Sequence, residues 1–335
     1  MRSFAQRTGL VGLVLLLAAT SAWANGVTPQ LLVAHRDGGE TSDPGGIFSY
    51  GLDGTVNGRW DDLASWPTGR PPTGLAYDGE YVYAHVGDHT GAVKRFNPDG
   101  TFVDDIVPSG GSFGNLYVDA THIYVSQQDP VRPVLRFDKT NGAAAPSAGQ
   151  SGANFTAPSE SPNNARTVLL GGAGLANILV GEVGTGFLQY DGTTGARVGG
   201  GTGVFINKPR AFFAASGDPN GTGTDSLFLL DDPFAGGSNR VIEYNLATGA
   251  VIGDYGLGGG LPMSSGIAFD NAGALYALVP GNNQVAKVGP GGGNFGFFVT
   301  AGAGESGILF IPEPGTLALL GMSGLAVFVR PRREA

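Results

Sequence analysis

The chain has 335 residues, of which 59 are glycine and none is cysteine, and its formal net charge is −9. The absence of cysteine excludes disulfides, thiolate catalysis and cysteine-ligated zinc, and the negative charge argues against nucleic acid and anionic lipid as partners. Hydrophobic residues make up 41% of the chain, which is enough for a folded core, so the high glycine content indicates many turns rather than disorder.

The N-terminus has the pattern of a secretory signal peptide over residues 1–24. Arg2 and Arg7 precede an apolar stretch from residue 10 to residue 19, and the small residues Ala22 and Ala24 follow. This order of charged, apolar and small residues predicts export through the Sec machinery and cleavage after Ala24. An uncleaved N-terminal membrane helix is the alternative interpretation, and under either one the body of the protein is exported.

Residues 25–311 contain a repeated strand pattern. An alternating apolar segment follows a turn at residues 73–78, 114–119, 265–270 and 306–311. The interval from Gly266 to Gly307 is close to the roughly 40 to 50 residues of one propeller blade. In the full units a second strand, a third strand ending in an aromatic residue and a turn, and a short fourth strand follow. Each unit is therefore predicted to be a four-stranded antiparallel meander.

Six such units are predicted, at approximately residues 31–57, 70–107, 112–149, 165–201, 208–256 and 262–300. The first unit lacks its opening strand, and residues 306–311 are available to supply it. Pairing of the N- and C-terminal strands would then close the ring without an open edge. The predicted fold is an all-β, six-bladed β-propeller that is monomeric, and a β-sandwich is the alternative.

The repeat pattern resembles the six-bladed propellers of the NHL and SMP-30/gluconolactonase-like group. This resemblance implies a metal-dependent lactonase or lyase as one functional alternative. Such an enzyme would need three or more oxygen or nitrogen side chains converging at the mouth of the central channel. Asp78, Asp119, Asp231 and Asp270 are the candidates for that role.

The histidines do not form an obvious metal site. His85 and His89 are four residues apart, but the intervening turn removes the helical geometry that would direct both rings at one ion. A solvated hairpin is the simpler interpretation of this segment. His35 and His122 are isolated in the sequence.

Three pairs of adjacent acids occur, at Asp61-Asp62, Asp104-Asp105 and Asp231-Asp232. A general acid and a general base need to converge on one substrate, whereas neighbouring side chains on a strand face opposite ways. These pairs are therefore expected to be solvated turns and strand ends rather than catalytic dyads.

The strongest local candidate for a ligand site lies at residues 218–225. Oxygen-bearing side chains alternate there, at Asp218, Asn220, Thr222 and Asp225, as they do in loops that wrap a calcium ion. The match is partial, because Thr222 replaces an expected acid and Leu229 stands where a calcium loop has glutamate. A structural calcium ion is one interpretation and a polar hairpin of ordinary turn residues is the other. No other cofactor is expected.

Residues 312–335 form a tripartite tail. The motif Pro312-Glu313-Pro314 is followed by an apolar run from residue 315 to residue 329, and the basic residues Arg330, Arg332 and Arg333 end it. As a helix the apolar run reaches about 22 Å, short of the roughly 30 Å hydrocarbon core of a bilayer. The arginines favour the cytoplasmic side, which leaves the body across the membrane. We predict a short transmembrane helix that anchors the protein transiently in the inner membrane.

This tail resembles the PEP-CTERM sorting signal of Gram-negative bacteria. The resemblance covers only the tail. It implies cleavage near the Pro-Glu-Pro motif by an exosortase-type membrane peptidase, and an association with exopolysaccharide-producing surfaces and biofilms. An ordinary buried C-terminal helix is the alternative, which the basic cluster after a Pro-x-Pro break argues against.

The favoured function is a noncatalytic propeller at the cell surface or in the extracellular matrix. It would bind extracellular polysaccharide or a surface protein through its loop-rich faces. Trp60 and Trp66 are candidates for a stacking surface, although burial in the core is the simpler interpretation for each. No catalytic residue is predicted, and the metal-dependent lactonase or lyase remains the alternative.

Overall fold

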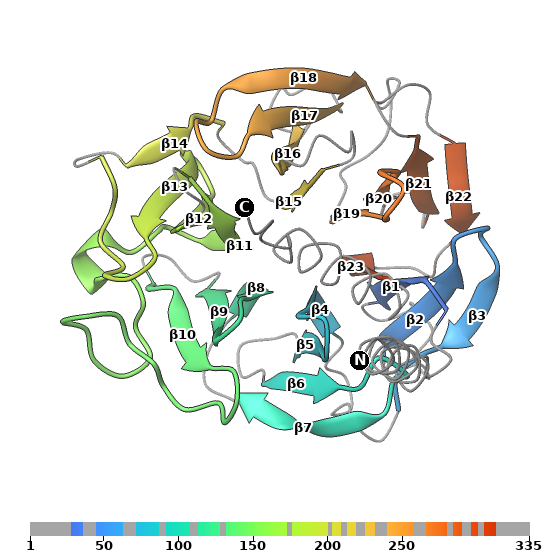
Figure 1. The fold of residues 1–335 in the computed structure, drawn as a ribbon, viewed down its shortest axis with the longest axis horizontal. Helices are drawn as coiled ribbons and strands as arrows, with labels where there is room; N and C mark the ends of the chain where they lie inside the picture. The colour runs from blue at the N-terminus through green and yellow to red at the C-terminus, as the bar shows by residue number, and fades with distance from the viewer. Residues whose placement is uncertain are drawn as a thin grey trace, which may run out of the picture.

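The computed structural model describes residues 28–35, 45–62, 72–86, 92–107, 113–127, 132–172, 176–199, 203–208, 213–218, 225–231, 240–256, 266–279, 284–289, 296–300 and 305–312. Within these residues the strands form six antiparallel sheets around a central axis, which appear as a ring of blades in Figure 1. The chain is a six-bladed β-propeller, as the repeats predict. Among the described residues no helix is long and apolar enough to cross a membrane.

The first blade joins the two ends of the body. From the axis outwards it contains β23 (Glu305–Ile311), β1 (Gln30–His35), β2 (Gly46–Gly51) and β3 (Val56–Arg59). The register of β1 on β23 runs from Gln30 opposite Ile311 to His35 opposite Glu305. The predicted closure of the ring by the C-terminal strand is therefore confirmed. The innermost strand of this blade, β23, pairs with β1 on its outer side.

The remaining blades follow in chain order. The second contains β4 (Pro72–Tyr77), β5 (Val82–Val86), β6 (Val93–Phe96) and β7 (Phe102–Val107), and the third contains β8 (Phe113–Val118), β9 (His122–Gln127) and β10 (Leu135–Asp138). The fourth contains β11 (Ala165–Gly171), β12 (Asn177–Glu182), β13 (Gly186–Asp191) and β14 (Val204–Ile206). The fifth contains β15 (Ala214–Gly217), β16 (Ser226–Asp231), β17 (Arg240–Asn245) and β18 (Val251–Gly256), and the sixth contains β19 (Ile267–Phe269), β20 (Leu275–Val279), β21 (Gln284–Val288) and β22 (Gly296–Thr300).

The third blade differs from the prediction because its fourth strand is replaced by irregular backbone. Ala144 bridges to Phe137 and Asn154 bridges to Leu135, but the residues between them form no ladder. Proline at position 146 lacks the amide that a ladder needs. The fourth blade also differs, since its outer strand β14 begins at Val204, beyond the predicted limit of residue 201.

Six apolar clusters fill the spaces between neighbouring blades rather than the blades themselves. On β1, Leu31 and Val33 pack against Tyr276 of the sixth blade, whereas Leu32 and Ala34 pack against the second blade. This division follows from the strand period of two, which sends successive side chains to opposite faces of a sheet. The same arrangement recurs at the other four interfaces. Each blade is therefore stabilised mainly by its neighbours.

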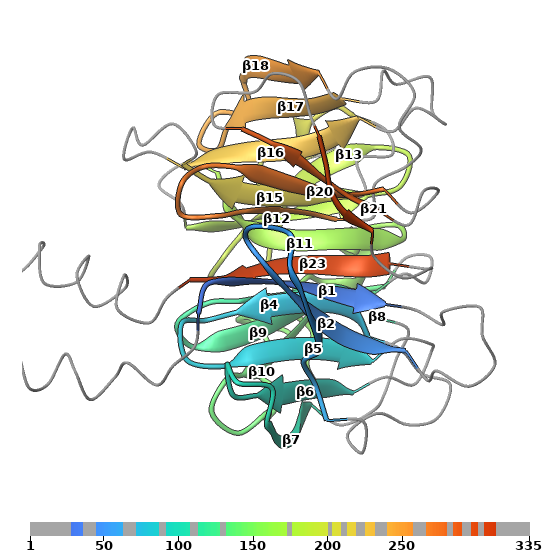
Figure 2. The ribbon, with the colours of Figure 1, turned by 90° about the vertical axis from the view of Figure 1, so that its right-hand side faces the viewer.

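The two faces of the ring carry different connections. In each antiparallel meander, the connection from the inner to the second strand and that from the third to the fourth lie on one face. This face, which we call the turn face, has tight turns at residues 78–81, 97–101, 119–122, 138–143, 191–196, 245–250 and 270–274. Gln30 and Ile311 also lie on it, because they pair with each other at the ends of β1 and β23. Figure 1 is viewed from the turn face, and Figure 2 shows β1 and β23 side by side in profile.

Glycines in the outer turns hold neighbouring blades together. Gly142 has a φ of 68°, and a Cβ added to it would lie 1.5 Å from the carbonyl oxygen of Ile106 in the preceding blade. Gly100 and Gly195 take the same position against Trp60 and Phe155. Only glycine combines the left-handed backbone with so close an approach. The outer turn of a blade is thus docked onto the outer edge of the blade before it.

Candidate functional site

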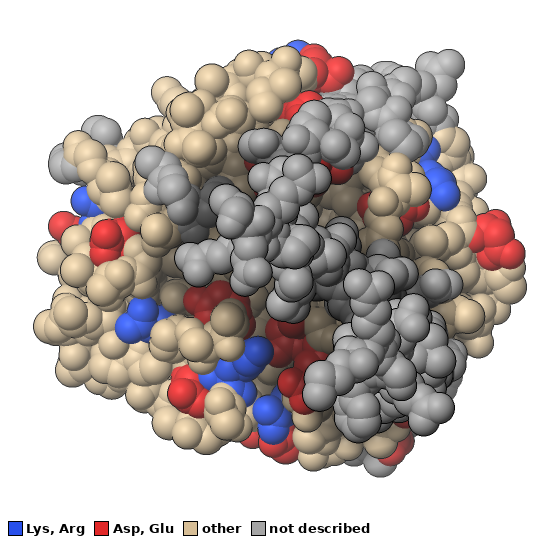
Figure 3. Space-filling model, viewed as in Figure 1, with Lys and Arg blue, Asp and Glu red and all other residues tan. Residues whose placement is uncertain are grey.

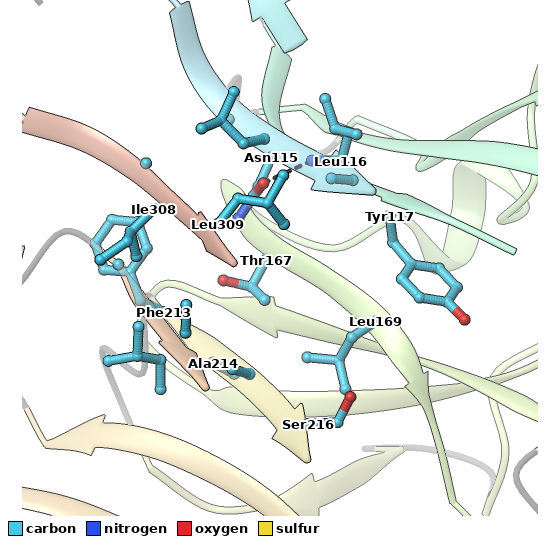
Figure 4. A pocket seen from close by; sticks show the side chains of 18 of the residues that line it. Asn115, Leu116, Tyr117, Thr167, Leu169, Phe213, Ala214, Ser216, Ile308 and Leu309 are labelled. Carbon is cyan, nitrogen blue, oxygen red and sulfur yellow. Dashed lines mark hydrogen bonds between the residues drawn. The ribbon is translucent and has the colours of Figure 1, made fainter. Parts of the chain in front are cut away.

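The inner strands surround a central channel with a volume of about 330 Å³. Its wall comes from β4, β8, β11, β15, β19 and β23, with Phe213 preceding β15. Figure 4 shows labelled side chains from β8, β11, β15 and β23 around this space. The channel is lined by the first strand of every blade, and four of these strands overlap the segments that recur in the sequence, at residues 73–78, 114–119, 265–270 and 306–311.

The channel wall is neutral. None of the described residues that line it is a lysine, arginine, histidine, aspartate or glutamate. Its polar side chains belong to Tyr77, Asn115, Tyr117, Thr167 and Ser216. Burial, with a contribution from the Asp119 carboxylate, raises the pKa of Tyr117 to about 12. This part of the wall therefore offers hydroxyl and amide groups for hydrogen bonding and no group that ionises near neutral pH.

Asn115 is the most constrained of these polar residues. Its side-chain oxygen accepts a hydrogen bond from the backbone amide of Leu116 at 2.8 Å, and the backbone amide of Asn115 donates to Ser126 Oγ at 2.8 Å. A Cβ on Gly74 would lie 2.9 Å from the same oxygen. Asn115 therefore fixes the irregular register of β8 and leaves room for β4 only because residue 74 is glycine.

Asp78, at the channel mouth on the turn face, is engaged by its own turn and by the next blade. Its carboxylate accepts hydrogen bonds from the amides of Tyr81 at 2.7 Å and Glu80 at 2.8 Å and from the Tyr83 hydroxyl at 3.0 Å. Lys139 of the third blade lies 2.9 Å away. Burial alone would raise the pKa of Asp78, but these hydrogen bonds and the lysine hold it below its usual value. The carboxylate is therefore ionised and used for structure.

The equivalent aspartates in other blades also accept hydrogen bonds from the amides of their own turns. Asp270 accepts hydrogen bonds from the amides of Ala272 and Ala274 at 2.9 Å and from the Tyr276 hydroxyl at 3.0 Å. Asp119 accepts from the amides of Thr121 and His122 at 2.7 Å. Each carboxylate closes the turn between the first and second strands, as side-chain acceptors do in Asx-turns.

Sequence reasoning missed this role of the aspartates, although the signal was present. A tyrosine follows Asp78 by five residues and Asp270 by six, and in both cases its hydroxyl reaches back to the carboxylate. The recurring aromatic residue on the second strand was thus a partner of the aspartate. Acidic and basic atoms lie side by side on the turn face over the blades that contain β4 and β8 (Figure 3).

The remaining candidate ligands for a channel metal are only partly described. Asp231 is the last residue of β16, and its carboxylate lies outside the described part of the structure. Within the part of the chain that the structure describes, no cluster of three or more histidine, aspartate or glutamate side chains could hold a metal ion.

The predicted calcium loop lies between the first two strands of the fifth blade. Asp218 directly follows β15, and the exposed Asp225 directly precedes β16, so the two flank a hairpin connection whose last pair is Gly217 and Ser226. Asn220 and Thr222 lie outside the described residues. The calcium site itself remains a prediction.

The histidines are held in separate environments. His85 on β5 is buried, and its Nδ1 atom lies 2.5 Å from the Thr73 hydroxyl. Burial lowers its pKa to about 3, so this ring is neutral. His35 on β1 is also buried, with Nε2 3.3 Å from the Tyr50 hydroxyl. The solvated hairpin expected for His85 is therefore wrong at this residue, while His89 lies outside the described part.

Asp61, Asp104 and Asp105 differ from the expected solvated turns and strand ends, although the side chains of Asp104 and Asp105 remain partly exposed. Asp61 is buried and lies 2.8 Å from Arg59 Nε; burial raises its pKa to about 6 although the arginine opposes this shift. Asp104 and Asp105 lie within β7 and pair with Arg95 and Lys94 at 2.6 and 2.5 Å. Cross-strand register, which places each acid opposite a base on β6, accounts for these ion pairs.

Trp60 packs into the body, as its simpler interpretation predicts. Its indole nitrogen donates to the carbonyl of Pro98 at 3.1 Å, and its ring lies 5.7 Å from that of Phe96. It is thus part of the interface between the first two blades. Trp66 lies outside the described residues, as do Asp232, the signal-peptide residues Ala22 and Ala24, and the tail from Glu313 onwards.

The tail is the part of the chain that comparison with known families identifies. Residues 310–333 match the PEP-CTERM protein-sorting motif. The motif implies an exported surface protein that passes through the membrane and is processed by an exosortase. It covers Pro312, Glu313 and Pro314 and the basic residues up to Arg333, and it overlaps the last two residues of β23.

The body has structural relatives. No curated protein sequence matches the chain. The crystal structure of a nidogen/laminin complex matches with a TM-score of 0.53 and 14% identity, covering 84% of this chain and 98% of the other. A computationally designed protein, Ika8, matches with a TM-score of 0.40 and 11% identity over 73% of this chain and 68% of the designed one. At these identities the first match supports the propeller fold alone.

Proposed function

We propose that the protein is a noncatalytic binding or structural propeller of the extracellular matrix, delivered by its sorting tail. The partner would be an exopolysaccharide or another surface protein, as the association of such tails with biofilms suggests. The body would serve as a rigid display scaffold, with an exosortase-type peptidase and the Sec machinery acting on its two ends. Recognition would use the face opposite the turn face, where the longer connections between strands and blades lie.

The observation that carries this proposal is the occupation of the carboxylates at the channel mouth. In Asp78, Asp119 and Asp270 the Oδ1 atom accepts hydrogen bonds from turn amides. In Asp78 and Asp270 the Oδ2 atom also accepts a tyrosine hydroxyl. A propeller hydrolase would need such side chains to converge on a metal and a substrate. Redirecting them would break the turns between first and second strands. The neutral channel wall supports the same conclusion for the described residues.

A glycan array tests the proposed binding with the folded body, residues 25–312. The body is expected to bind a defined class of acidic or neutral extracellular polysaccharide on the array. In parallel, the body is incubated with a panel of lactones with and without calcium. Turnover that requires the metal would overturn the noncatalytic proposal and would establish the lactonase alternative.

Cell fractionation tests the sorting part of the proposal. Cells produce either the full chain or a chain that ends at Ile311. The full chain is expected in the membrane first and at the cell surface later, whereas the shorter chain is exported without surface retention. An identical distribution of the two chains would reject a sorting role for the tail.

A further inference from the structure

The tail leaves the body from a defined place, close to the axis of the turn face. Ile311 ends β23, has no exposed surface and pairs with Gln30. β23 is the innermost strand of its blade, and Ile308 and Leu309 line the central channel. The chain is thus fixed to the propeller up to the residue before the Pro-Glu-Pro motif. No flexible linker separates the folded body from the sorting signal.

The connection between the body and the apolar run is too short to allow free rotation. Residues 312–315 span at most about 14 Å when fully extended. The seven residues of β23 make the propeller about 23 Å thick along its axis, so the opposite face lies beyond this reach. An orientation in which the propeller stands on its edge against the membrane is also prevented. Three strand spacings and a side chain place the outer edge of the blade roughly 19 Å from β23, which is farther than residues 312–315 reach.

A second, independent feature lies on the rim of the same face. The exposed large apolar side chains of the described residues are Val56, Val103, Val251, Ile252 and Phe297. Each occupies the first or second position of an outermost strand, β3, β7, β18 or β22. Because the outermost strands start at the turn face, these side chains form an interrupted apolar rim around it, which we call the turn-face rim.

From these two features we propose that the turn-face rim rests on the lipid bilayer surface while the tail anchors the protein. The inference rests on the proposed sorting function, because the tail must insert for the rim to reach lipid. The apolar side chains contact the interfacial region, and the aspartates of the inner turns stay hydrated. The opposite face then points away from the membrane and is open to extracellular partners. The contact is weak and reversible, since a few isolated side chains bury little area.

Single-cysteine labelling tests the proposal cleanly, because the chain contains no cysteine of its own. Ile252→Cys places a fluorophore on the turn-face rim, and Val183→Cys places one on the connection between β12 and β13, on the opposite face. The full chain is reconstituted in phosphatidylcholine vesicles that contain a headgroup spin-labelled lipid as a short-range quencher. Quenching several-fold stronger at position 252 than at position 183 is expected.

Equal quenching at the two positions, or stronger quenching at position 183, would overturn the orientation. Co-sedimentation with the vesicles separates this result from failure of the tail: a chain that does not sediment with lipid refutes the membrane role of the tail and the orientation with it. A flexible insertion of about 20 Gly and Ser residues after Ile311, with a reach of roughly 25 Å, is expected to reduce the difference. A concentration-dependent dimer in which label 252 is shielded without lipid would show that a second copy covers the rim, and would also overturn the proposal.

Discussion

Removal of β23 is the most direct test of how the ring is held closed. Two chains are compared, one comprising residues 25–312 and one comprising residues 25–304. They differ by the strand that pairs with β1 in the first blade. The longer chain lacks the predicted signal peptide and the tail beyond Pro312, and its body is expected to fold as it does in the full protein.

The expected loss follows from what β23 buries. Ile311 has no exposed surface and Ile308 is 7% exposed, and burial of each isoleucine contributes about 1.5–3 kcal/mol. The backbone hydrogen bonds to β1 are offset by the conformational entropy of the residues that they order. Loss of the strand also exposes Leu31 and Val33, which pack in the same cluster as Ile308. We expect the free energy of unfolding to fall by about 4–6 kcal/mol, a large share of the 5–15 kcal/mol typical of a domain.

Urea denaturation followed by tyrosine and tryptophan fluorescence measures this loss. At a slope of about 2 kcal/mol per molar urea, the midpoint of the shorter chain is expected to fall by roughly 2–3 M. A synthetic peptide of residues 305–312 is expected to restore part of the stability, and a peptide of the same composition in scrambled order is not. Equal midpoints for the two chains would refute the conclusion that the C-terminal strand closes and stabilises the ring.

Two further predictions concern the turns and the buried histidine. Gly142→Ala is expected to destabilise the protein by about 2–5 kcal/mol, since left-handed strain adds to the clash with Ile106, whereas Gly152→Ala, with a similar φ but open space around it, should cost only about 1 kcal/mol. Similar thermal midpoints for the two variants would contradict the docking of outer turns. The pKa of His85 falls from 6.5 to about 3 through burial, so the native state binds fewer protons and stability should decline by a few kcal/mol as the pH falls from about 6.5 towards 3. The Asp61 carboxyl, with its pKa raised to about 6, makes the free energy of unfolding rise over the same range as the pH falls. Urea titrations therefore compare His85→Gln with the unchanged chain, and the variant is expected to lose less stability on acidification. An equal loss of stability in the two chains between about pH 6.5 and pH 3 would refute the conclusion that burial of His85 causes the acid sensitivity.

The repeats made the fold predictable because they combine two regular signals. A continuous apolar run, as at residues 31–34, identifies a strand that is buried on both faces. The recurrence of the inner-strand pattern at 265–270 and 306–311 then gives the period of a blade and shows that one strand is displaced to the C-terminus. Closure follows from these two observations. The N-terminal blade lacks its inner strand, and one inner strand without a blade of its own remains at the C-terminus.

The roles of the individual polar residues could not be predicted in the same way. Burial of Asp61 and His85 depends on which blades meet at their positions, and cross-strand ion pairs such as Arg95 with Asp104 depend on register. The irregular outer edge of the third blade likewise depends on contacts between residues 134–137 and 144–155 that carry no local signal. The turn-face rim emerges only when the starts of outer strands from different blades are brought to one side.

The position of β23 at the end of the body has a consequence for biogenesis. β23 is the last strand of the body to be synthesised. A nascent chain in the cytosol therefore lacks the strand that closes the ring until synthesis of the apolar run is nearly finished. We expect such a chain to remain incompletely folded, which favours its passage through the export machinery. We therefore expect the ring to close only after export, when β23 is available to pair with β1.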